Sequence, residues 1–321
     1  MKRIGLFCGG FSSEFDISIK SAQTIRAHFP KDFDCFMIIV KKNNWEVQFD
    51  NYTTPFDLNT ASFVNNGEVI RVDAALIYTH GDPGENGKIQ AYLEMVGIPY
   101  LNSGVLASAL SFDKWYCNQF LKGFGFNVAS SVIMTSIKQY NTNELIHTLG
   151  LPIFVKPADS GSSYGISKVK VASELMPALE IAFNEGKRVI LESFLDGTEV
   201  TCGVYRTKKE ITALPLTEIV SDTEFFDFEA KYNGRSQEIT PARISPELTL
   251  KVQETAKHIY DLLGLKAIAR IDFMLVNNEA YVIEVNTTPG FSPASIVPQM
   301  LAAAKISIAE FWQEIIQVEL N

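Results

Sequence analysis

The chain has 321 residues, a formal net charge of −9 and a composition that is 46% hydrophobic and 20% charged. These proportions are those of an ordinary globular protein, and they exclude an intrinsically disordered chain or a fibrous repeat. The acidic balance argues against nucleic acid or an anionic membrane as the main partner, although a few placed basic residues can still bind an anionic ligand.

The chain also lacks the patterns of zinc-binding, secreted and membrane proteins. Its four cysteines and four histidines are scattered, with no CxxC and no zinc-ligand spacing. No apolar run approaches the ~18 residues that a membrane span needs, and the apolar stretch near Met1 is too short for an export signal. We therefore expect a cytoplasmic protein with reduced cysteines, and neither nucleic acid nor a membrane as partner.

The first hundred residues alternate between apolar runs and amphipathic stretches. Three apolar runs predict buried parallel strands: 3–8, 34–40 and 72–78. Two amphipathic stretches predict helices: 17–29 and 88–96. Glycine-rich segments follow the first and third runs, and ligands of a doubly wound sheet bind beyond the carboxyl ends of its strands. The sequence therefore predicts a small α/β domain with both glycine-rich loops on its functional edge.

From about residue 103 the pattern changes to shorter strands and longer helices. The predicted helices are 103–123, 247–263 and 306–318. The predicted strands are 153–156, 166–171, 189–194, 199–205, 267–276 and 279–286. Three α+β lobes in sequence fit the length better than one large sheet. We expect domains at 1–102, 103–191 and 192–321, the second with a phosphate loop and the third with the metal and substrate site.

A glycine-serine segment at 159–165 lies between two of these predicted strands. No GxxxxGK[ST] or GxGxxG motif occurs in the chain, and strands flank the segment on both sides, so we expect a hairpin tip. Its amides and the hydroxyls of Ser162 and Ser163 could close over phosphates, which Lys156 at the preceding strand end could also reach. A plain solvated turn is the alternative.

Two strands near the C-terminus carry a sharper pattern of alternating polar and apolar residues. Arg270 and Asp272 lie in one strand, and Glu284 and Asn286 lie in the next. If the strands pair as a hairpin, Asp272, Glu284 and Asn286 can face one site, and three oxygen ligands without sulfur or imidazole suit Mg²⁺. A charged, solvent-facing side of the hairpin is the alternative, but polar residues among such apolar neighbours need partners.

A third pattern runs from an apolar strand into acidic residues, between Leu191 and Glu199. Such a strand edge offers backbone groups to an adenine, with a carboxylate beyond it for ribose hydroxyls. A turn at Asp196-Gly197 with exposed acids is the alternative.

Together these segments resemble the D-alanine–D-alanine ligases of the ATP-grasp superfamily, nearly from end to end. Eight short motifs carry the resemblance: Gly9-Gly10-x-Ser12-Ser13-Glu14; His80-Gly81 with Gly84-Glu85-Asn86-Gly87; Ser103 to Ala109 leading to Asp113-Lys114; Val155-Lys156-Pro157; Gly161-Ser162-Ser163-x-Gly165; Glu229-Ala230-Lys231-Tyr232; Arg270-x-Asp272; and Glu284-x-Asn286-Thr287-x-Pro289-Gly290. Each motif is weak by itself, but eight in order are highly specific. The resemblance implies an ATP-grasp fold of α/β and α+β class, with three lobes and an N-terminal doubly wound α/β domain.

The resemblance also implies an activity, the joining of two D-alanines for peptidoglycan synthesis. ATP phosphorylates the carboxylate of one D-alanine, and the amine of the second then displaces phosphate from the acyl phosphate. The first step brings two anions together, so catalysis must be mostly positioning and charge neutralisation. The resemblance further implies two Mg²⁺ ions, with Mn²⁺ as an alternative metal, and a homodimer.

Nucleotide and metal contacts follow from the same resemblance. Lys114 and Lys156 would hold the α- and β-phosphates, and Lys231 would help with the γ-phosphate. Glu192 and the nearby backbone would bind adenine, and Glu199 the ribose. The residues implied to bind the nucleotide are Lys114, Lys156, Ser162, Ser163, Glu192, Leu195, Glu199 and Lys231, and those implied to bind the metal are Asp272, Glu284 and Asn286.

The first D-alanine would be held by its ammonium. Glu14 resembles the family's anchor for that group, although an acid at a helix N-terminus is also good capping. In the family this acid is linked through a serine and a tyrosine, here Ser162 and Tyr232, which closes a lid over the site.

The reacting centre and the second D-alanine involve other residues. Arg270 and the backbone N–H of Gly290 resemble the oxyanion stabilisers of the tetrahedral intermediate. Ser295 and the backbone at Ile296 would hold the carboxylate of the second D-alanine. His80 lies in the substrate loop near that pocket, and a satisfied loop histidine is its alternative.

The chain departs from the family's usual pattern at four positions. They are Tyr164, which replaces a smaller apolar residue, Phe226 and Phe228, where tyrosines are common, and Ala294, where a histidine is often found. None of these changes removes a charge or a metal ligand. Tyr232 favours an amino-acid acceptor, since relatives that make D-alanyl-D-lactate commonly lack it. A ligase for D-serine or D-lactate, and a non-catalytic nucleotide-binding protein, remain the alternatives.

Overall fold

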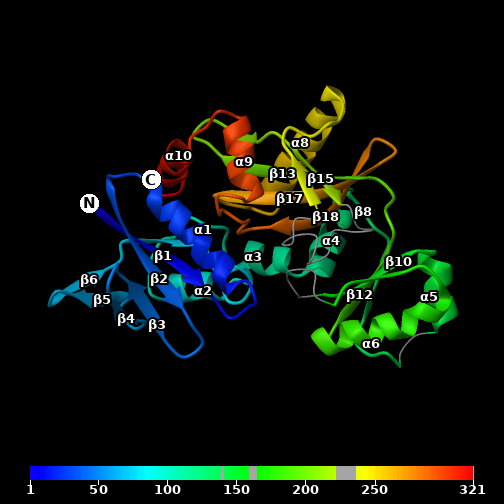
Figure 1. The fold of residues 1–321 in the computed structure, drawn as a ribbon, viewed down its shortest axis with the longest axis horizontal. Coiled ribbons are helices and arrows are strands. Elements are labelled where there is room, and N and C mark those ends of the chain that lie inside the picture. The colour runs from blue at the N-terminus through cyan, green and yellow to red at the C-terminus, as the bar shows by residue number, and fades with distance from the viewer. Residues whose placement is uncertain (139–140, 159–164, 222–235, 321) are drawn as a thin grey trace.

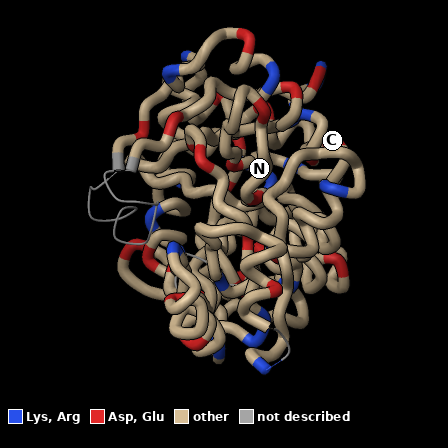
Figure 2. Tube along the Cα trace, turned by 90° about the vertical axis from the view of Figure 1, so that its right-hand side faces the viewer, with Lys and Arg blue, Asp and Glu red and all other residues tan. Residues whose placement is uncertain are grey.

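Three β-sheets form the framework of the protein, as a computed structural model shows (Figure 1). The structure describes residues 1–138, 141–158, 165–221 and 236–320. Within these ranges helices pack on all three sheets, and the mixed class expected from the sequence is confirmed. None of the described helices is long and apolar enough to cross a membrane. Figure 2 shows Lys and Arg interspersed with Asp and Glu along the chain.

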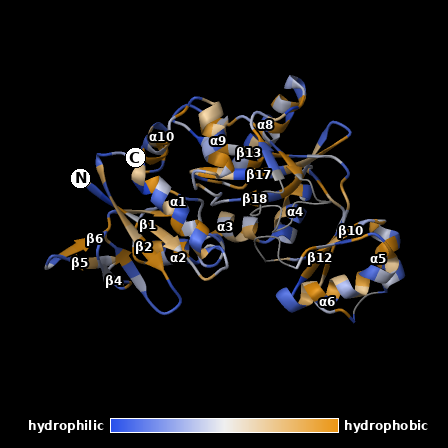
Figure 3. Ribbon diagram, viewed as in Figure 1, coloured by the Kyte–Doolittle hydropathy of each residue, from blue (hydrophilic) through white to orange (hydrophobic). Residues whose placement is uncertain are grey.

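The first sheet builds an α/β lobe from the N-terminal part of the chain. Its strands lie in the order β6 (Glu68–Arg71), β5 (Ser62–Asn65), β4 (Thr53–Asp57), β3 (Trp45–Gln48), β2 (Phe33–Val40), β1 (Lys2–Gly9) and β7 (Ala74–Ile77). Strand β1 pairs in parallel with β2 and β7, and these three are the strands predicted from the apolar runs. Helices α1 (Phe15–Ala27) and α2 (Lys88–Met95) belong to the cores on opposite faces of β1. Burial on both faces explains the continuous apolar sequence of β1 (Figure 3).

The central sheet is smaller and has helices on one face. Its strands lie in the order β11 (Ser167–Val169), β10 (Ile153–Pro157), β12 (Val189–Ser193) and β9 (Ser131–Met134). The helical segments beside it are α5 (Thr142–Leu149), the 3₁₀ turn η1 (Ala172–Glu174) and α6 (Leu175–Glu185). Ile153 and Val155 pack against α5 and α6. The alternate residues Phe154 and Lys156 therefore point to the other face.

The third sheet carries the predicted C-terminal hairpin. Its strands lie in the order β16 (Ser236–Ile239), β15 (Thr217–Ser221), β13 (Thr198–Arg206), β17 (Ile268–Val276), β18 (Glu279–Asn286) and β8 (Asn127–Val128), with β14 (Ile211–Ala213) paired to β13. Three helices pack on one face: α3 (Val105–Phe112), α4 (Lys114–Gly123) and α8 (Pro246–Leu262). Val200, Ile271 and Phe273 are buried beneath them. The opposite face carries the polar residues of the same strands.

The single helix expected at 103–123 is in fact two helices, α3 and α4. Asp113 separates them because its backbone is extended there, with ψ of 100°. Its Oδ1 accepts a hydrogen bond from the Tyr116 N–H at 3.1 Å, which caps α4. The prediction was wrong here because the apolar period continues through a residue that caps a new helix.

The order of packing differs from the order of the chain. The expected division at residue 191/192 falls inside β12, and residues 105–128 pack with the third sheet. At the end of the chain, α9 (Ile296–Ala303) and α10 (Ile308–Glu319) join the core of the first sheet. Figure 1 shows α10 close to α1. The C-terminal helices thus complete the N-terminal lobe.

Candidate active site

A pocket of about 740 Å³ lies between the polar faces of the second and third sheets and reaches the first lobe. It gathers every predicted site residue that the structure describes: Glu14, His80, Lys114, Lys156, Glu192, Leu195, Glu199, Arg270, Asp272, Glu284, Asn286, Gly290, Ser295 and Ile296. The remaining predicted residues lie outside the described ranges: Ser162, Ser163, Lys231 and Tyr232.

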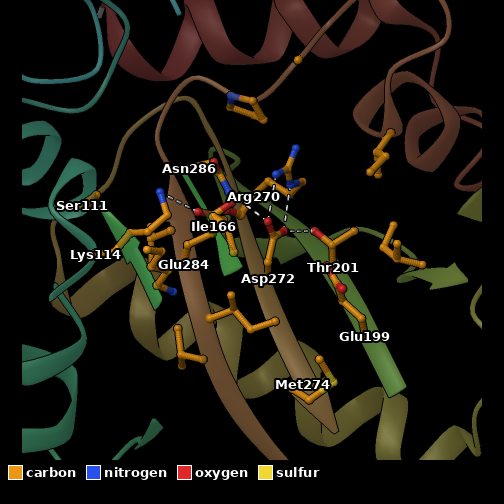
Figure 4. Close-up of a pocket in the computed structure, with 18 of the residues that line it drawn as sticks. Ser111, Lys114, Ile166, Glu199, Thr201, Arg270, Asp272, Met274, Glu284 and Asn286 are labelled. Carbon is orange, nitrogen blue, oxygen red and sulfur yellow. Dashed lines mark hydrogen bonds and ion pairs between the residues drawn. The ribbon is translucent and has the colours of Figure 1, made fainter. Parts of the chain in front are cut away.

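The floor of the pocket is the hairpin of β17 and β18 (Figure 4). Arg270 lies opposite Asn286, and Asp272 lies opposite Glu284. Arg270 donates from Nε to Oδ1 and from Nη2 to Oδ2 of Asp272, both at 2.8 Å. Asn286 Nδ2 also donates to Asp272 Oδ2, at 3.1 Å. Asp272 is 7% exposed, so the alternative of a solvent-facing hairpin is wrong.

A lysine of α4 neutralises the second carboxylate of the floor. Lys114 Nζ lies 3.0 Å from Glu284 Oε2. Burial lowers the pKa of Lys114, but the carboxylates of Glu284, Glu85 and Glu14 outweigh burial and raise it above its ordinary value. Two carboxylates placed directly opposite each other repel, so Arg270 and Lys114 supply the charge that holds this pair together.

The donor set of the floor fits a hard divalent cation. Asp272 and Glu284 offer carboxylate oxygens, and Asn286 offers an amide oxygen, which are the ligands that Mg²⁺ prefers. Within the described ranges no three His, Cys, Asp or Glu residues gather as a metal site. A cation here would therefore depend on the Asn286 oxygen and on oxygens of a bound phosphate. The cation would also compete for Asp272 with the hydrogen bonds that Arg270 and Thr201 donate to this carboxylate.

The roof of the pocket comes from the central sheet. Lys156 Nζ lies 2.6 Å from Glu192 Oε2, and both residues are nearly buried. Phe154 lies opposite Glu192 across β10 and β12, on the pocket face. The two charged residues predicted separately for phosphate and adenine are thus neighbours.

Apolar side chains that the sequence interpretation missed line the same part of the pocket: Phe154, Ile166, Phe194, Met274 and Val282. A slot with apolar walls and a few polar edges suits a planar base. These residues look like ordinary core positions in the sequence. The sequence signal that could have found them is the alternation of side chains along a strand. Phe154 is two residues from Lys156, and Met274 is two residues from Asp272, so each shares a face with a predicted site residue.

The polar end of β13 was only partly predicted. Glu199 lies opposite Met274, and Thr201 lies opposite Asp272. Thr201 Oγ1 donates a hydrogen bond to Asp272 Oδ1. Thr201 was missed, although its spacing of two from Glu199 places both side chains on the pocket face.

The first lobe closes the far end of the pocket with Glu14 and His80. Glu14 occupies the N-cap position of α1, but its side chain makes no capping hydrogen bond. Glu14 therefore makes no capping hydrogen bond, and the favourable interaction of its charge with the helix dipole stays the alternative. His80 is 5% exposed, and its Nε2 lies 3.3 Å from Ser21 Oγ. Burial lowers the pKa of His80, although the nearby Glu14 opposes this.

Helix α9 begins at the same end. Ser295 precedes its first residue, Ile296, and bonds to Ser292 Oγ at 2.8 Å instead of capping the helix. A Cβ at Gly290 would lie 3.0 Å from Ser295 Oγ, so glycine leaves room beside this hydroxyl. Backbone N–H groups at a helix start bind anions well.

Two further acids in the pocket were not predicted, Glu85 and Glu238. Glu85 Oε2 accepts a hydrogen bond from the Gly81 N–H at 2.7 Å, while burial and the nearby Glu14 raise the pKa of Glu85 to about 8. Burial also raises the pKa of Glu238, which accepts from Gln299 Nε2 at 2.6 Å. The glycine-rich loop around Glu85 was a usable signal, whereas no motif surrounds Glu238.

Known proteins share both the sequence and the fold of this chain. Residues 3–103 match the family described as D-ala D-ala ligase N-terminus, and residues 120–317 match D-ala D-ala ligase C-terminus. The D-alanine–D-alanine ligase of Parabacteroides distasonis is 46% identical over 323 residues, which cover 100% of this chain and 98% of that protein.

Solved structures agree with this relationship. VanG D-Ala:D-Ser ligase from Enterococcus faecalis superposes with a TM-score of 0.89 at 30% identity, covering 99% of both chains. The D-alanine–D-alanine ligase of Bacillus anthracis complexed with ATP has a TM-score of 0.80 at 28% identity, covering 100% of this chain and 98% of that one. Because both halves match in order and the likeness spans the whole chain, the protein belongs to the D-alanine–D-alanine ligase family and has its ATP-grasp fold.

Proposed function

We propose that the protein is an ATP-dependent ligase that joins two D-alanines and releases ADP and phosphate. The observation that carries this proposal is the composition of one pocket. It combines two lysines, a neutralised carboxylate pair, an arginine and a helix start, which are the groups that ATP and two amino acids would need. The match to the D-alanine–D-alanine ligase family and the similarity to the Parabacteroides distasonis ligase support the same activity.

ATP would lie between the second and third sheets. Lys156 from the roof and Lys114 from the floor would bind its α- and β-phosphates. Each ammonium group contacts a carboxylate in the structure, and phosphate oxygens would compete for the same groups. Adenine would enter the apolar slot around Phe154 and Met274, with Glu192 at its polar edge. The ribose hydroxyls would reach Glu199.

Mg²⁺ would be held by Asp272, Glu284 and Asn286, and two such ions would bind if the chain follows its family. When bound, the metal neutralises negative charge on the transferring phosphoryl group. Three facts support this: the two carboxylates lie directly opposite each other, they face the pocket, and all three residues offer oxygen.

The chain's own groups would position the two amino acids. Glu14 would accept the ammonium of the first D-alanine, and the lowered pKa of His80 leaves that ring neutral, so it adds no repulsion there. Arg270 would donate to the reacting carboxylate, because the pKa of its guanidinium is raised by Asp272 despite burial and the charge is permanent. The Gly290 N–H would share the oxyanion.

The second D-alanine would bind at the start of α9. Ser295 Oγ and the Ile296 N–H would take its carboxylate, where the helix dipole favours negative charge. We extend the proposal to Ser162, Ser163, Lys231 and Tyr232, whose lid and phosphate roles rest on the family resemblance. We also propose a homodimer on the same basis, which light scattering of the purified protein would test.

D-serine is the second candidate acceptor, because VanG D-Ala:D-Ser ligase shares the fold closely. The curated relative named for D-alanine is more similar in sequence, at 46% against 30% identity, which favours D-alanine as the acceptor.

Phosphate release by the purified protein tests the proposal. We expect release to require ATP, Mg²⁺ and D-alanine together, and the product to be D-alanyl-D-alanine. Mixtures of D-alanine with D-serine or D-lactate would rank the acceptors. Release that does not depend on D-alanine would overturn the activity, and a preference for D-lactate at neutral pH would overturn the acceptor.

A variant of the pocket floor serves as the control for contaminating enzymes. Glu284→Gln removes a metal ligand and the partner of Lys114 while keeping the size of the side chain. We expect turnover to fall by about 10²–10³-fold with little change in melting temperature. Unchanged turnover would mean that the phosphate comes from elsewhere.

A further inference from the structure

Arg188 joins two walls of the pocket without lining it. It directly precedes β12 of the central sheet, and its Nη2 forms an ion pair with Asp113 Oδ2. Asp113 lies between α3 and α4, which pack on the third sheet. The side chains are 29% and 14% exposed, so water screens this pair less than a surface pair.

The same guanidinium makes a second contact with α4. Its central carbon lies 5.3 Å from the centre of the Tyr116 ring, within the range of a cation–π interaction. The Tyr116 N–H also donates to the other carboxylate oxygen of Asp113, at 3.1 Å. Arg188 therefore holds both the residue that caps α4 and an aromatic ring in the first turn.

These contacts connect Arg188 to both segments that carry the lysines of the pocket. Lys114 follows Asp113 as the first residue of α4, and its ammonium contacts Glu284. On the other side, the carbonyl oxygen of Arg188 accepts a hydrogen bond from the Ala158 N–H at 2.9 Å. Ala158 is two residues beyond Lys156 on the chain, at the end of β10.

We propose that Arg188 is a positioning residue for the nucleotide, which fixes the helix start that carries Lys114 relative to the strand end that carries Lys156. The inference rests on the proposed function in one respect, that these two lysines bind the phosphates of ATP. Two cations must match the spacing of two phosphates, so a loosened contact between the lobes weakens phosphate binding more than it slows the chemical step.

Three substitutions test the contact itself. Arg188→Gln keeps a long polar side chain but removes the charge, and we expect it to raise the Kd for ADP and the KM for ATP about tenfold. The KM for D-alanine should stay unchanged. Asp113→Asn keeps a side-chain oxygen that can accept from the Tyr116 N–H and cap α4, and it should have the same nucleotide-specific effect. Arg188→Lys should recover only part of the affinity, since an ammonium lacks the planar fork and the stacking of a guanidinium.

The double variant and a matched control separate positioning from general stability. Arg188→Gln with Asp113→Asn should be no worse than either single change, because both remove one interaction. Arg206→Gln removes another arginine–aspartate pair, with Asp261 at 2.8 Å, on an exposed surface outside the pocket lining. It should leave the ADP and ATP constants unchanged.

Nucleotide binding, measured by calorimetry with ADP alone, keeps this inference separate from the proposed activity. A wild-type protein that binds ADP but makes no dipeptide would overturn the activity and leave the test of Arg188 intact. An Arg188→Gln variant that melts earlier but binds ADP and ATP as the wild type does would overturn the positioning role. A wild-type protein that binds no ADP would overturn both.

Discussion

Glu85 illustrates at the scale of one residue how tertiary structure changes the chemistry of a side chain. It lies in a glycine-rich loop, where an isolated carboxyl would be ionised at neutral pH. Burial raises its pKa to about 8, the charges of Glu14 and Glu284 add to this, and the Gly81 N–H and Lys114 oppose it. The folded protein therefore binds a proton at Glu85 more tightly than the unfolded chain does.

This difference predicts a pH dependence of stability. The stabilising contribution of protonated Glu85 is complete below the ordinary pKa of 4.5 and is lost as the pH rises toward about 8. We expect the free energy of unfolding to fall over that range less steeply in Glu85→Gln than in the wild type. The glutamine oxygen can still accept from the Gly81 N–H. Urea unfolding without nucleotide or metal, from pH 5 to 8.5, measures the slope.

Glu180→Gln is the matched control, because Glu180 is an exposed carboxylate on α6. It should keep the wild-type pH dependence. Identical slopes for Glu85→Gln and the wild type would show that Glu85 is not the group responsible.

At the level of single elements, the starts of two helices show where the local sequence is enough to predict the role of a residue. Ser307 caps α10: its Oγ accepts from the Glu310 N–H at 3.2 Å, and Glu310 Oε2 accepts from the Ser307 N–H at 3.0 Å. This reciprocal pattern is local and is visible in the sequence. Ser295 occupies the same position before α9, but it bonds to Ser292 and faces the pocket. The same residue type thus has a structural role in one helix and a candidate binding role in another.

The cap of α10 leads to a stability prediction. Ser307→Ala should lower the free energy of unfolding by about 1 kcal/mol, since the Glu310 N–H loses its acceptor. Ser307→Thr keeps the hydroxyl and should lose less. Chemical denaturation measures both, and equal losses would mean that the hydroxyl contributes nothing. Turnover should remain at the wild-type level because Ser307 lies outside the pocket lining.

The whole molecule depends on contacts between the two ends of the chain. Trp312 on α10 is fully buried in the core that contains Ile4 and Leu6 of β1. Its ring lies 5.8 Å from that of Tyr78 and 5.2 Å from that of Phe291. The N-terminal sheet therefore completes its core only when the last helix is in place.

Removing this ring should destabilise the whole protein. We expect Trp312→Ala to lower the free energy of unfolding by about 3–5 kcal/mol, through lost burial and the cavity that remains. Trp312→Phe should cost much less, because it keeps a ring and Nε1 of Trp312 has no hydrogen-bond partner among the described residues. Urea denaturation measures both variants. A loss below about 1 kcal/mol for the alanine variant would show that α10 contributes little to the core.

Part of the fold could be predicted because its signals are local. The apolar runs of β1, β2 and β7 and the amphipathic period of α8 require only neighbouring residues. The short strands β3 to β6 were left unassigned, since they have no sustained period and gain their stability by pairing with β2 and with one another. The break at Asp113 was missed because the apolar period continues through this residue, and the sequence alone does not show that its side chain caps a new helix.

The sequence by itself predicted candidate residues for the chemistry and indicated, through eight ordered motifs, which family the chain resembles. Its net charge of −9 indicated nothing about the cationic and metal-binding side chains that an anionic substrate would need at one place. Only the tertiary structure decided how these groups pair. Lys114 contacts Glu284, Lys156 contacts Glu192, and Arg188 contacts Asp113, each across segments far apart in the chain. Charges interact through distance in space, and the separation of residues along the sequence does not specify that distance until the sheets have packed.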